Sequence, residues 1–298
     1  MEVKYWCVRP GTFRLDGGAM FGIIPRPLWQ KTAPPDQDNR INLALRLWLI
    51  KTSNKVILVD TGIGDYHGPK FDGRFAVVGG QDPIKTALRE AENLSPEDIT
   101  DVVISHLHFD HAGGLTHLTQ NATICSRFPM AHLHLHRQHY EYALKATERD
   151  AGSFHQNYFG PVIQDHEARG LISWHQGNSG IILSDHDYQL QFKTSMGHTP
   201  YLMHPFDSQY FYMADLVPTA AHIHVPWIMA YDMVPGVSTS DKRQLLNFCI
   251  EQKLTLLFEH DPDNWGAIVT YDKEKDQFSC QKTFQQLTPG ACPIPSNR

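Results

Sequence analysis

The run His106-Leu107-His108-Phe109-Asp110-His111 decides how the rest of this sequence is interpreted. It follows directly on the apolar stretch 102–104, which we expect to be a buried strand. On a turn after a strand, the first two histidines can project together, while the aspartate and the last histidine point into an adjacent volume. Imidazole and carboxylate are suitable ligands for zinc or a similar divalent ion. The run therefore predicts a metal centre with two ions, and a buried strand leading into it disfavours a metal-free surface turn.

One loop cannot complete the coordination of two ions, so further ligands should lie at other strand ends. His198 follows a strand-like region near residue 190. Asp215 follows the apolar stretch 210–213, and His260 follows the apolar stretch 254–258. Each of these residues, taken alone, could equally be an ordinary polar residue of the surface or core. They are the three candidates for the missing ligands.

The composition narrows the class of protein. With 298 residues, 41% hydrophobic and 19% charged, the chain resembles an ordinary folded soluble protein. The absence of repeats and flexible linkers predicts one domain over residues 1–298. The net charge of -6 argues against a nucleic-acid partner held by phosphate contacts.

Sequence features also predict a cytoplasmic location. The five cysteines are odd in number and form no CxxC pair, which favours reduced thiols. The first residues lack the apolar segment of a signal peptide, and the longest apolar runs are too short to span a bilayer. We therefore expect no membrane partner.

Periodicity predicts alternating strands and helices. A hairpin is expected over 43–59, and a second strand pair should surround the turn at 185–187. Asp82 and Pro83 suit the start of a helix over 82–92, and Ser95 suits the start of a short helical turn. A further helix is expected over 240–252, and the proline-containing segment 289–298 is expected to be loose.

The stretch HLHFDHAGG at residues 106–114 resembles the HxHxDH signature of the metallo-β-lactamase-fold hydrolases. His198, Asp215 and His260 match the downstream ligand order of that superfamily, and Asp60-Thr61-Gly62 resembles its upstream strand-end motif. The similarity extends over residues 40–265. It implies an α+β fold, the αββα sandwich, with metals at one edge between the ends of the two sheets.

The resemblance also implies a role for each matching residue. It assigns to one metal His106, His108 and His198. It assigns to the other metal Asp110, His111 and His260. Asp215 would bridge the two ions, and Asp60 would fix the tautomer of a ligating histidine. Two zinc ions are the first expectation, with manganese, cobalt or iron as alternatives.

A hydrolytic mechanism follows from two metals. A water that bridges two divalent cations loses a proton near neutral pH and becomes a hydroxide nucleophile. One metal would polarise a carbonyl or phosphoryl oxygen of the substrate. Asp110 would orient the nucleophile and later give a proton to the leaving group.

The segment Asp16–Gly22, followed by Pro25, Pro27 and Trp29, resembles the acyl-homoserine lactonase and methyl-parathion-hydrolase-like branch, especially its quorum-quenching lactonases. The resemblance implies that an N-terminal loop over 10–35 walls the substrate pocket or contacts a partner subunit in a homodimer. The alternative is an apolar loop that only packs on the core.

Aromatic and apolar residues are candidates for the substrate pocket. The expected lining residues are Met20, Phe21, Phe109, His222 and Trp227. The first three would supply an apolar wall for an acyl chain. The last two could instead belong to a loop packed by its own aromatic side chains.

The chain departs from the branch at two places. Some of these lactonases carry a catalytic tyrosine three residues after the bridging aspartate, where this sequence has Pro218. Residues 201–204 replace the Gly-His pair that commonly follows the GHTP motif, and Tyr201 is the candidate to supply the missing hydroxyl.

Histidines outside the motif have a structural interpretation. The HxHxH pattern over 132–136 could bind metal from one face of a strand, but the family pattern favours a structural strand. His139 is expected on a helix surface.

The leading hypothesis is a metal-dependent hydrolase that opens lactone esters, most of all N-acyl-homoserine lactones. Phosphotriester or thioester hydrolysis on the same metals is the alternative. RNA processing is disfavoured by the acidic charge balance. A non-enzymatic metal-binding protein and a persulfide dioxygenase with one iron are also considered; the complete set of candidate ligands disfavours both.

Overall fold

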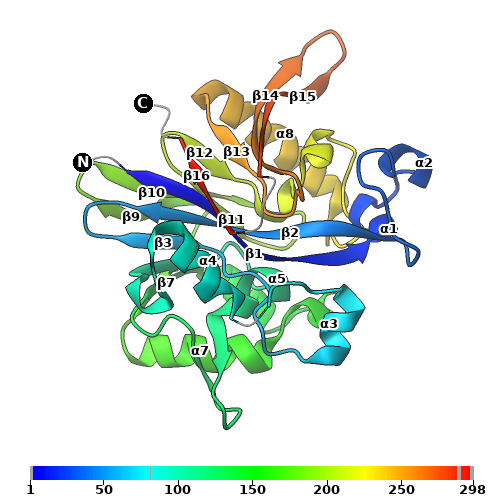
Figure 1. Ribbon diagram of the computed structural model, residues 1–298. Helices are drawn as coiled ribbons and strands as arrows, with labels where there is room; N and C mark the ends of the chain where they lie inside the picture. Colours follow the sequence, from blue (N-terminus) through cyan, green and yellow to red (C-terminus); the bar gives the residue numbers. More distant parts are fainter. Residues whose placement is uncertain (1–2, 81, 287–289, 296–298) are drawn as a thin grey trace.

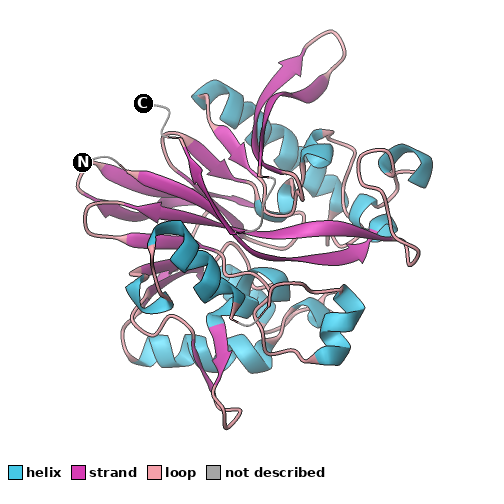
Figure 2. Cartoon of the chain, viewed as in Figure 1, coloured by secondary structure: helices cyan, strands magenta, loops and turns pink. Residues whose placement is uncertain are grey.

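Two β-sheets pack face to face, and helices cover their outer faces (Figure 1). The structure is a computed structural model, which describes residues 3–80, 82–286 and 290–295. Figure 2 shows the strands gathered in the middle of the molecule with helices on both sides. This arrangement is the αββα sandwich that the sequence predicts.

The first sheet contains both the earliest and the latest described strands. Its order is β16-β1-β2-β3-β4-β7-β8. The bounds are β16 (Gly290–Ile294), β1 (Lys4–Asp16), β2 (Arg40–Lys51), β3 (Val56–Val59), β4 (Asp101–Val103), β7 (His132–His136) and β8 (Ile172–His175). From β3 to β8 the pairing is parallel, so the ends of β3 and β4 lie side by side.

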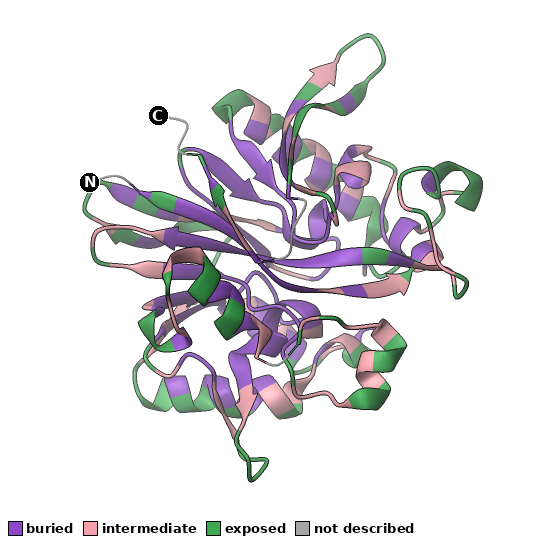
Figure 3. Cartoon of the chain, viewed as in Figure 1, coloured by how far each residue is buried: buried purple, intermediate pink, exposed green. Residues whose placement is uncertain are grey.

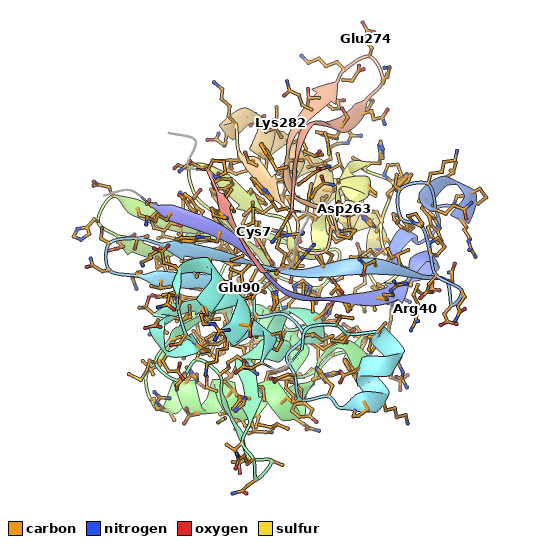
Figure 4. All side chains as sticks on the ribbon, viewed as in Figure 1. Cys7, Arg40, Glu90, Asp263, Glu274 and Lys282 are labelled. Carbon is orange, nitrogen blue, oxygen red and sulfur yellow. The ribbon has the colours of Figure 1, made fainter. Side chains whose placement is uncertain are left out.

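The second sheet is built almost entirely from neighbours in sequence. Its order is β15-β14-β13-β12-β11-β10-β9. The bounds are β9 (Ser179–Asp185), β10 (Tyr188–Ser195), β11 (Leu202–Phe206), β12 (Tyr210–Tyr212), β13 (Thr255–Leu257), β14 (Asn264–Asp272) and β15 (Gln277–Gln285). A separate small hairpin joins β5 (Thr116–Leu118) to β6 (Ile124–Ser126). Glu274 marks the tip of the β14–β15 hairpin, which projects beyond the rest of the sandwich (Figure 4).

Helices and short turns connect these strands. The helices are α1 (Gly17–Phe21), α2 (Arg26–Trp29), α3 (Pro69–Phe75), α4 (Pro83–Glu92), α5 (Phe109–Ala112), α6 (Arg137–Ala143), α7 (Gln156–Ala168) and α8 (Pro235–Gln252). The 3₁₀ turns are η1 (Pro96–Asp98), η2 (Gly113–Leu115), η3 (Ala151–Ser153), η4 (Ala214–Leu216) and η5 (Ala220–Ile223). Among the described residues, no helix combines the length and the apolar character needed to cross a membrane.

Alternation along β1 shows how the layers are separated. Tyr5 and Cys7 pack between the two sheets, whereas Trp6 and Val8 pack under the helices of the first sheet. Successive side chains of a strand point to opposite faces, so a strand buried on both faces is apolar throughout. Figure 3 shows the central strands as the most continuously buried part of the molecule.

Most predicted elements are confirmed, with small shifts of their ends. The hairpin, the strand pair around 185–187 and the helix α4 lie where the sequence predicts them. Helix α8 begins at Pro235, five residues before the predicted start at 240, because Pro235 occupies its first turn without disturbing it.

Two predictions about the ends of the chain were wrong. Residues 290–294, expected to be loose, form the edge strand β16 against β1. Pro293 is tolerated there because an edge strand has one unpaired side; Pro289 and residues 296–298 lie outside the described residues. The N-terminal segment 10–35 is not one loop, since Asp16 caps the helix α1 by accepting a 2.8 Å hydrogen bond from Ala19 N.

We predict that Leu190→Ala lowers the free energy of unfolding by about 2–5 kcal/mol, because Leu190 is fully buried between the sheets. Ile181, on the paired strand β9, is 52% exposed and gives the matched control. Ile181→Ala should change the stability by less than about 0.5 kcal/mol. Urea unfolding followed by tryptophan fluorescence measures both, and equal losses would contradict the layer assignment.

Candidate metal centre

The turn that carries the histidine run is pressed against the end of β3. Thr61 N donates to His111 O at 2.8 Å, and Gly114 N donates to Gly62 O at 3.0 Å. A Cβ on Gly114 would lie 2.1 Å from Thr61 O, so a larger residue could not make this approach. The close contact of two strand ends fixes where the run projects its side chains.

The candidate ligands converge from four segments that belong to both sheets. His106 and His108 follow β4, and Asp110 and His111 lie on α5. The others lie beyond strands of the second sheet, after β10, β12 and β13, and are His198, Asp215 and His260. All seven side chains are buried.

The first ligand group is formed by three histidines and one carboxylate. His108 Nδ1 lies 3.0 Å from His106 Nε2 and 3.2 Å from His198 Nε2. His198 Nε2 in turn lies 3.2 Å from Asp215 Oδ2. The four ligand atoms lie within 4.8 Å of one another.

The second ligand group lies on the other side of Asp215. His260 Nε2 is 3.3 Å from His111 Nε2 and 3.6 Å from Asp110 Oδ2. Asp215 Oδ1 faces the same group, at 3.2 Å from His260 Nε2 and 3.4 Å from His111 Nε2. One carboxylate thus presents one oxygen to each group.

These distances fit divalent ions. Two nitrogens bound to one tetrahedral zinc at 2.0–2.1 Å are separated by about 3.3 Å, close to the nitrogen–nitrogen distances in both groups. Asp215 Oδ1 is buried and, among the described residues, accepts no hydrogen bond. A cation at each group would satisfy this oxygen and the converging imidazole nitrogens.

The electrostatics of the cluster lead to the same interpretation. Burial opposes the charged form of His198, but Asp215 and Asp232 outweigh it and raise the pKa of His198 to about 10. Burial likewise opposes the charged form of His260, and Asp215 outweighs it to raise that pKa to about 9. The pKa of Asp215 lies well below its usual value despite burial, because imidazoles surround it. Divalent ions would take the place of the protons that this carboxylate draws onto the histidines.

The sequence matches the metallo-beta-lactamase superfamily over residues 47–248. This match covers more than half of the chain. The chain belongs to the metallo-beta-lactamase superfamily.

Curated relatives within the superfamily match over limited segments. An N-acyl homoserine lactonase from Bacillus cereus is 38% identical over 85 residues, which cover 26% of this chain and 34% of the relative. A probable metallo-hydrolase from Mycobacterium tuberculosis is 29% identical over 133 residues, covering 39% of this chain and 38% of the relative. The matched segments therefore span little more than a third of these relatives.

Solved structures of the superfamily match over nearly the whole chain. A probable metal-dependent hydrolase from Staphylococcus aureus has a TM-score of 0.80 at 25% identity, covering 96% of this chain and 97% of that one. A dizinc quorum-quenching lactonase in complex with its product N-hexanoyl-L-homoserine has a TM-score of 0.70 at 19% identity, with 94% of each chain covered. The second likeness shows a shared fold.

Hydrogen bonds on the side away from the centre orient the candidate ligand histidines. Asp60 Oδ2 lies 3.0 Å from His111 Nδ1, while its carboxylate also accepts from Ser105 N at 2.7 Å. His260 Nδ1 donates to Ala44 O at 2.8 Å. A nitrogen held in this way directs the opposite ring nitrogen toward the centre.

Three residues that support the candidate metal centre were not predicted from the sequence. Asp232 Oδ1 lies 2.8 Å from His198 Nδ1, and Glu259 Oε2 lies 2.7 Å from His111 Nδ1. His139, expected on a helix surface, is buried; its Nε2 accepts from Leu107 N at 2.8 Å. Glu259 directly precedes His260 and could have been noticed, but nothing in the local sequence marks Asp232 or His139.

A cavity of about 200 Å³ opens onto both ligand groups. Met20 and Phe109 line it, as expected. Its other apolar lining residues are Leu15, Phe75 and Met229. Met20, Phe109 and these three form the wall that we call the apolar wall.

Three residues that were expected at the substrate pocket do not line this cavity, namely Phe21, His222 and Trp227. His222 Nε2 donates to Met20 O at 2.8 Å, and its ring stacks on Phe21 at 4.7 Å between ring centres. Trp227 packs edge-on against Phe21 at 5.5 Å. Phe21 and Trp227 belong to the same hydrophobic cluster as Met20 and Met229, so they support the apolar wall without lining the cavity.

Tyr201 and histidines of the HxHxH pattern make their contacts outside the cavity. The Tyr201 hydroxyl accepts from Gln138 Nε2 at 2.9 Å, and Tyr201 does not line the cavity, so it is not placed to replace a catalytic tyrosine. His134 lies 3.0 Å from Asp101 and 3.2 Å from His175. Among the described residues, His132, His134 and His136 belong to no group of three side chains that could hold a metal.

We predict that wild-type protein reloaded with zinc after chelation binds two ions per chain, and that His108→Ala binds one. His108 belongs to the first ligand group alone, so the second group should keep its ion. His186→Ala is the control, because the His186 side chain is 69% exposed on the turn between β9 and β10 and belongs to no candidate ligand group. Metal analysis by mass spectrometry measures the stoichiometry; two ions in His108→Ala would refute the assignment.

Proposed function

We propose that this chain is a dinuclear metal-dependent hydrolase that opens lactone esters, with N-acyl-homoserine lactones as the first candidate substrates. The observation that carries the proposal is the pair of ligand groups that share Asp215 and face one cavity. A dizinc quorum-quenching lactonase with the same fold supports this substrate class.

The centre would hold two divalent ions, zinc first, with manganese, cobalt or iron as alternatives. The first group supplies three histidines and shares Asp215 with the second, which supplies two histidines and Asp110. When bound, the ions would polarise the ester carbonyl and lower the pKa of a water molecule. Asp110 lines the cavity, so its carboxylate can orient that water and pass a proton to the departing alcohol.

The apolar wall suits a substrate that joins an ester to a hydrocarbon chain. Met20 lies on α1 and Phe109 on α5, and both line the same cavity as Asp110. Burial of each methylene of an acyl chain against such a wall contributes about 0.8 kcal/mol. Small polar esters would lose this contribution.

We predict that the zinc-loaded protein hydrolyses N-hexanoyl-homoserine lactone with a higher kcat/KM than a phosphotriester or a thioester. The measurement is a panel of these three classes followed by product formation. Asp110→Asn should reduce kcat on the preferred class by at least about 100-fold, because the carboxylate orients and carries protons. Preferred turnover of the phosphotriester or the thioester would replace the lactone proposal by the corresponding alternative.

We propose further that the protein forms a homodimer through the α1–α2 segment. This segment projects from the sandwich in Figure 1, and Ile23 and Leu28 on it are 90% and 51% exposed. Exposed apolar side chains gathered on one projection are typical of a contact surface.

Ile23→Asp should therefore shift the protein from dimer to monomer in sedimentation velocity, since a charge at an apolar contact must be desolvated. Met130→Asp is the matched control, because Met130 is 66% exposed on another part of the surface. A wild-type monomer, or a dimer that both variants retain, would contradict the assignment.

A further inference from the structure

The cavity contains two polar side chains besides the candidate ligands among the described residues. These are Ser153 on η3 and Tyr231, in the loop between η5 and α8. We propose that the Tyr231 hydroxyl binds the substrate by donating a hydrogen bond to an oxygen of the scissile ester. This inference rests on the proposed function, which it deepens by naming a residue that touches the reacting group.

The Tyr231 hydroxyl is available for such a bond. It makes no hydrogen bond to any other residue that the structure describes, and Tyr231 lines the cavity together with Asp110 and Asp215. An ordinary tyrosine has a pKa of about 10, so its hydroxyl keeps its proton at neutral pH and can act as a donor.

The backbone on both sides of Tyr231 is fixed. Ala230 N donates to Ala19 O at 2.8 Å, which ties the loop to α1. On the other side, Asp232 accepts from His198, and Met233 N donates to His198 O at 3.1 Å. Tyr231 lies between these two contact points, so the contacts that hold the candidate ligand His198 also hold the backbone of Tyr231 in position.

Such a donor has a defined use in ester hydrolysis. Negative charge develops on the carbonyl oxygen when the nucleophile adds, and on the ring oxygen when the carbon–oxygen bond breaks. A donor held in place beforehand stabilises this charge without reorganising. Tyr201, whose hydroxyl is bound to Gln138 outside the cavity, lacks this access.

The test compares Tyr231→Phe with Tyr201→Phe in zinc-loaded protein. Each variant removes one hydroxyl, but only the first removes it from the cavity. Three quantities are measured: the zinc content, the kcat and KM for the best substrate of the three-class panel, and the Kd of the ring-opened product N-hexanoyl-homoserine by calorimetry. The last value does not depend on turnover.

We expect Tyr231→Phe to keep two zinc ions and to lose about 100-fold in kcat. Its product Kd should rise about tenfold, which corresponds to one hydrogen bond of about 1.4 kcal/mol. Tyr201→Phe should stay within twofold of wild type in every quantity. Unchanged kcat and unchanged product Kd in Tyr231→Phe would overturn the inference.

The outcomes separate the two proposals. If wild type hydrolyses a thioester or phosphotriester in place of lactones, the lactone proposal fails, and the loss in Tyr231→Phe on that substrate still decides the role of Tyr231. If the wild-type protein hydrolyses none of the three classes, the change in product Kd between wild type and Tyr231→Phe decides whether Tyr231 binds the ligand. A loss of zinc in Tyr231→Phe would show a structural role and also overturn the inference.

Discussion

The Asp215 carboxylate, buried between two groups of imidazoles, is the interaction on which the rest of the structure depends. Its two oxygens face His198 on one side and His260 on the other, both at 3.2 Å. A buried carboxylate is costly unless cations or hydrogen-bond donors surround it. Segments from both sheets must therefore end at one edge, and the face-to-face packing of the sandwich is what brings them there.

Supporting carboxylates extend this arrangement outward. His111 contacts Asp60 and Glu259 through Nδ1, and His198 contacts Asp232 through the same ring atom. Each contact directs Nε2 inward, toward Asp215. Acidic residues of three different loops thus hold the candidate ligand histidines, so the geometry of the centre depends on the whole fold and not on the histidine run alone.

The sequence predicts the parts of this protein that depend on local pattern. The αββα fold, the hairpin at β2–β3 and the helix α4 follow from periodicity, from turn residues or from the resemblance carried by the run over 106–111. The contacts of Asp232 and His139 could not be predicted, because a loop aspartate or helical histidine carries no mark of what it meets in space. The prediction of a loose segment at residues 290–294 was wrong for a related reason. Five residues that include a proline show no strand pattern of their own, and they form a strand because they pair with β1.

The pairing of β16 with β1 also bears on how the molecule folds. Tyr5 lies opposite Ile294, so the outer edge of the first sheet joins residues almost the whole sequence apart. Contacts of such separation carry a large loop-closure entropy and slow the folding rate. During synthesis, β1 must wait with one edge unpaired until residue 294 has left the ribosome, and an unpaired strand edge can add strands of other chains. In the second sheet each strand pairs with its neighbour in sequence, so that sheet needs no contact of comparable separation.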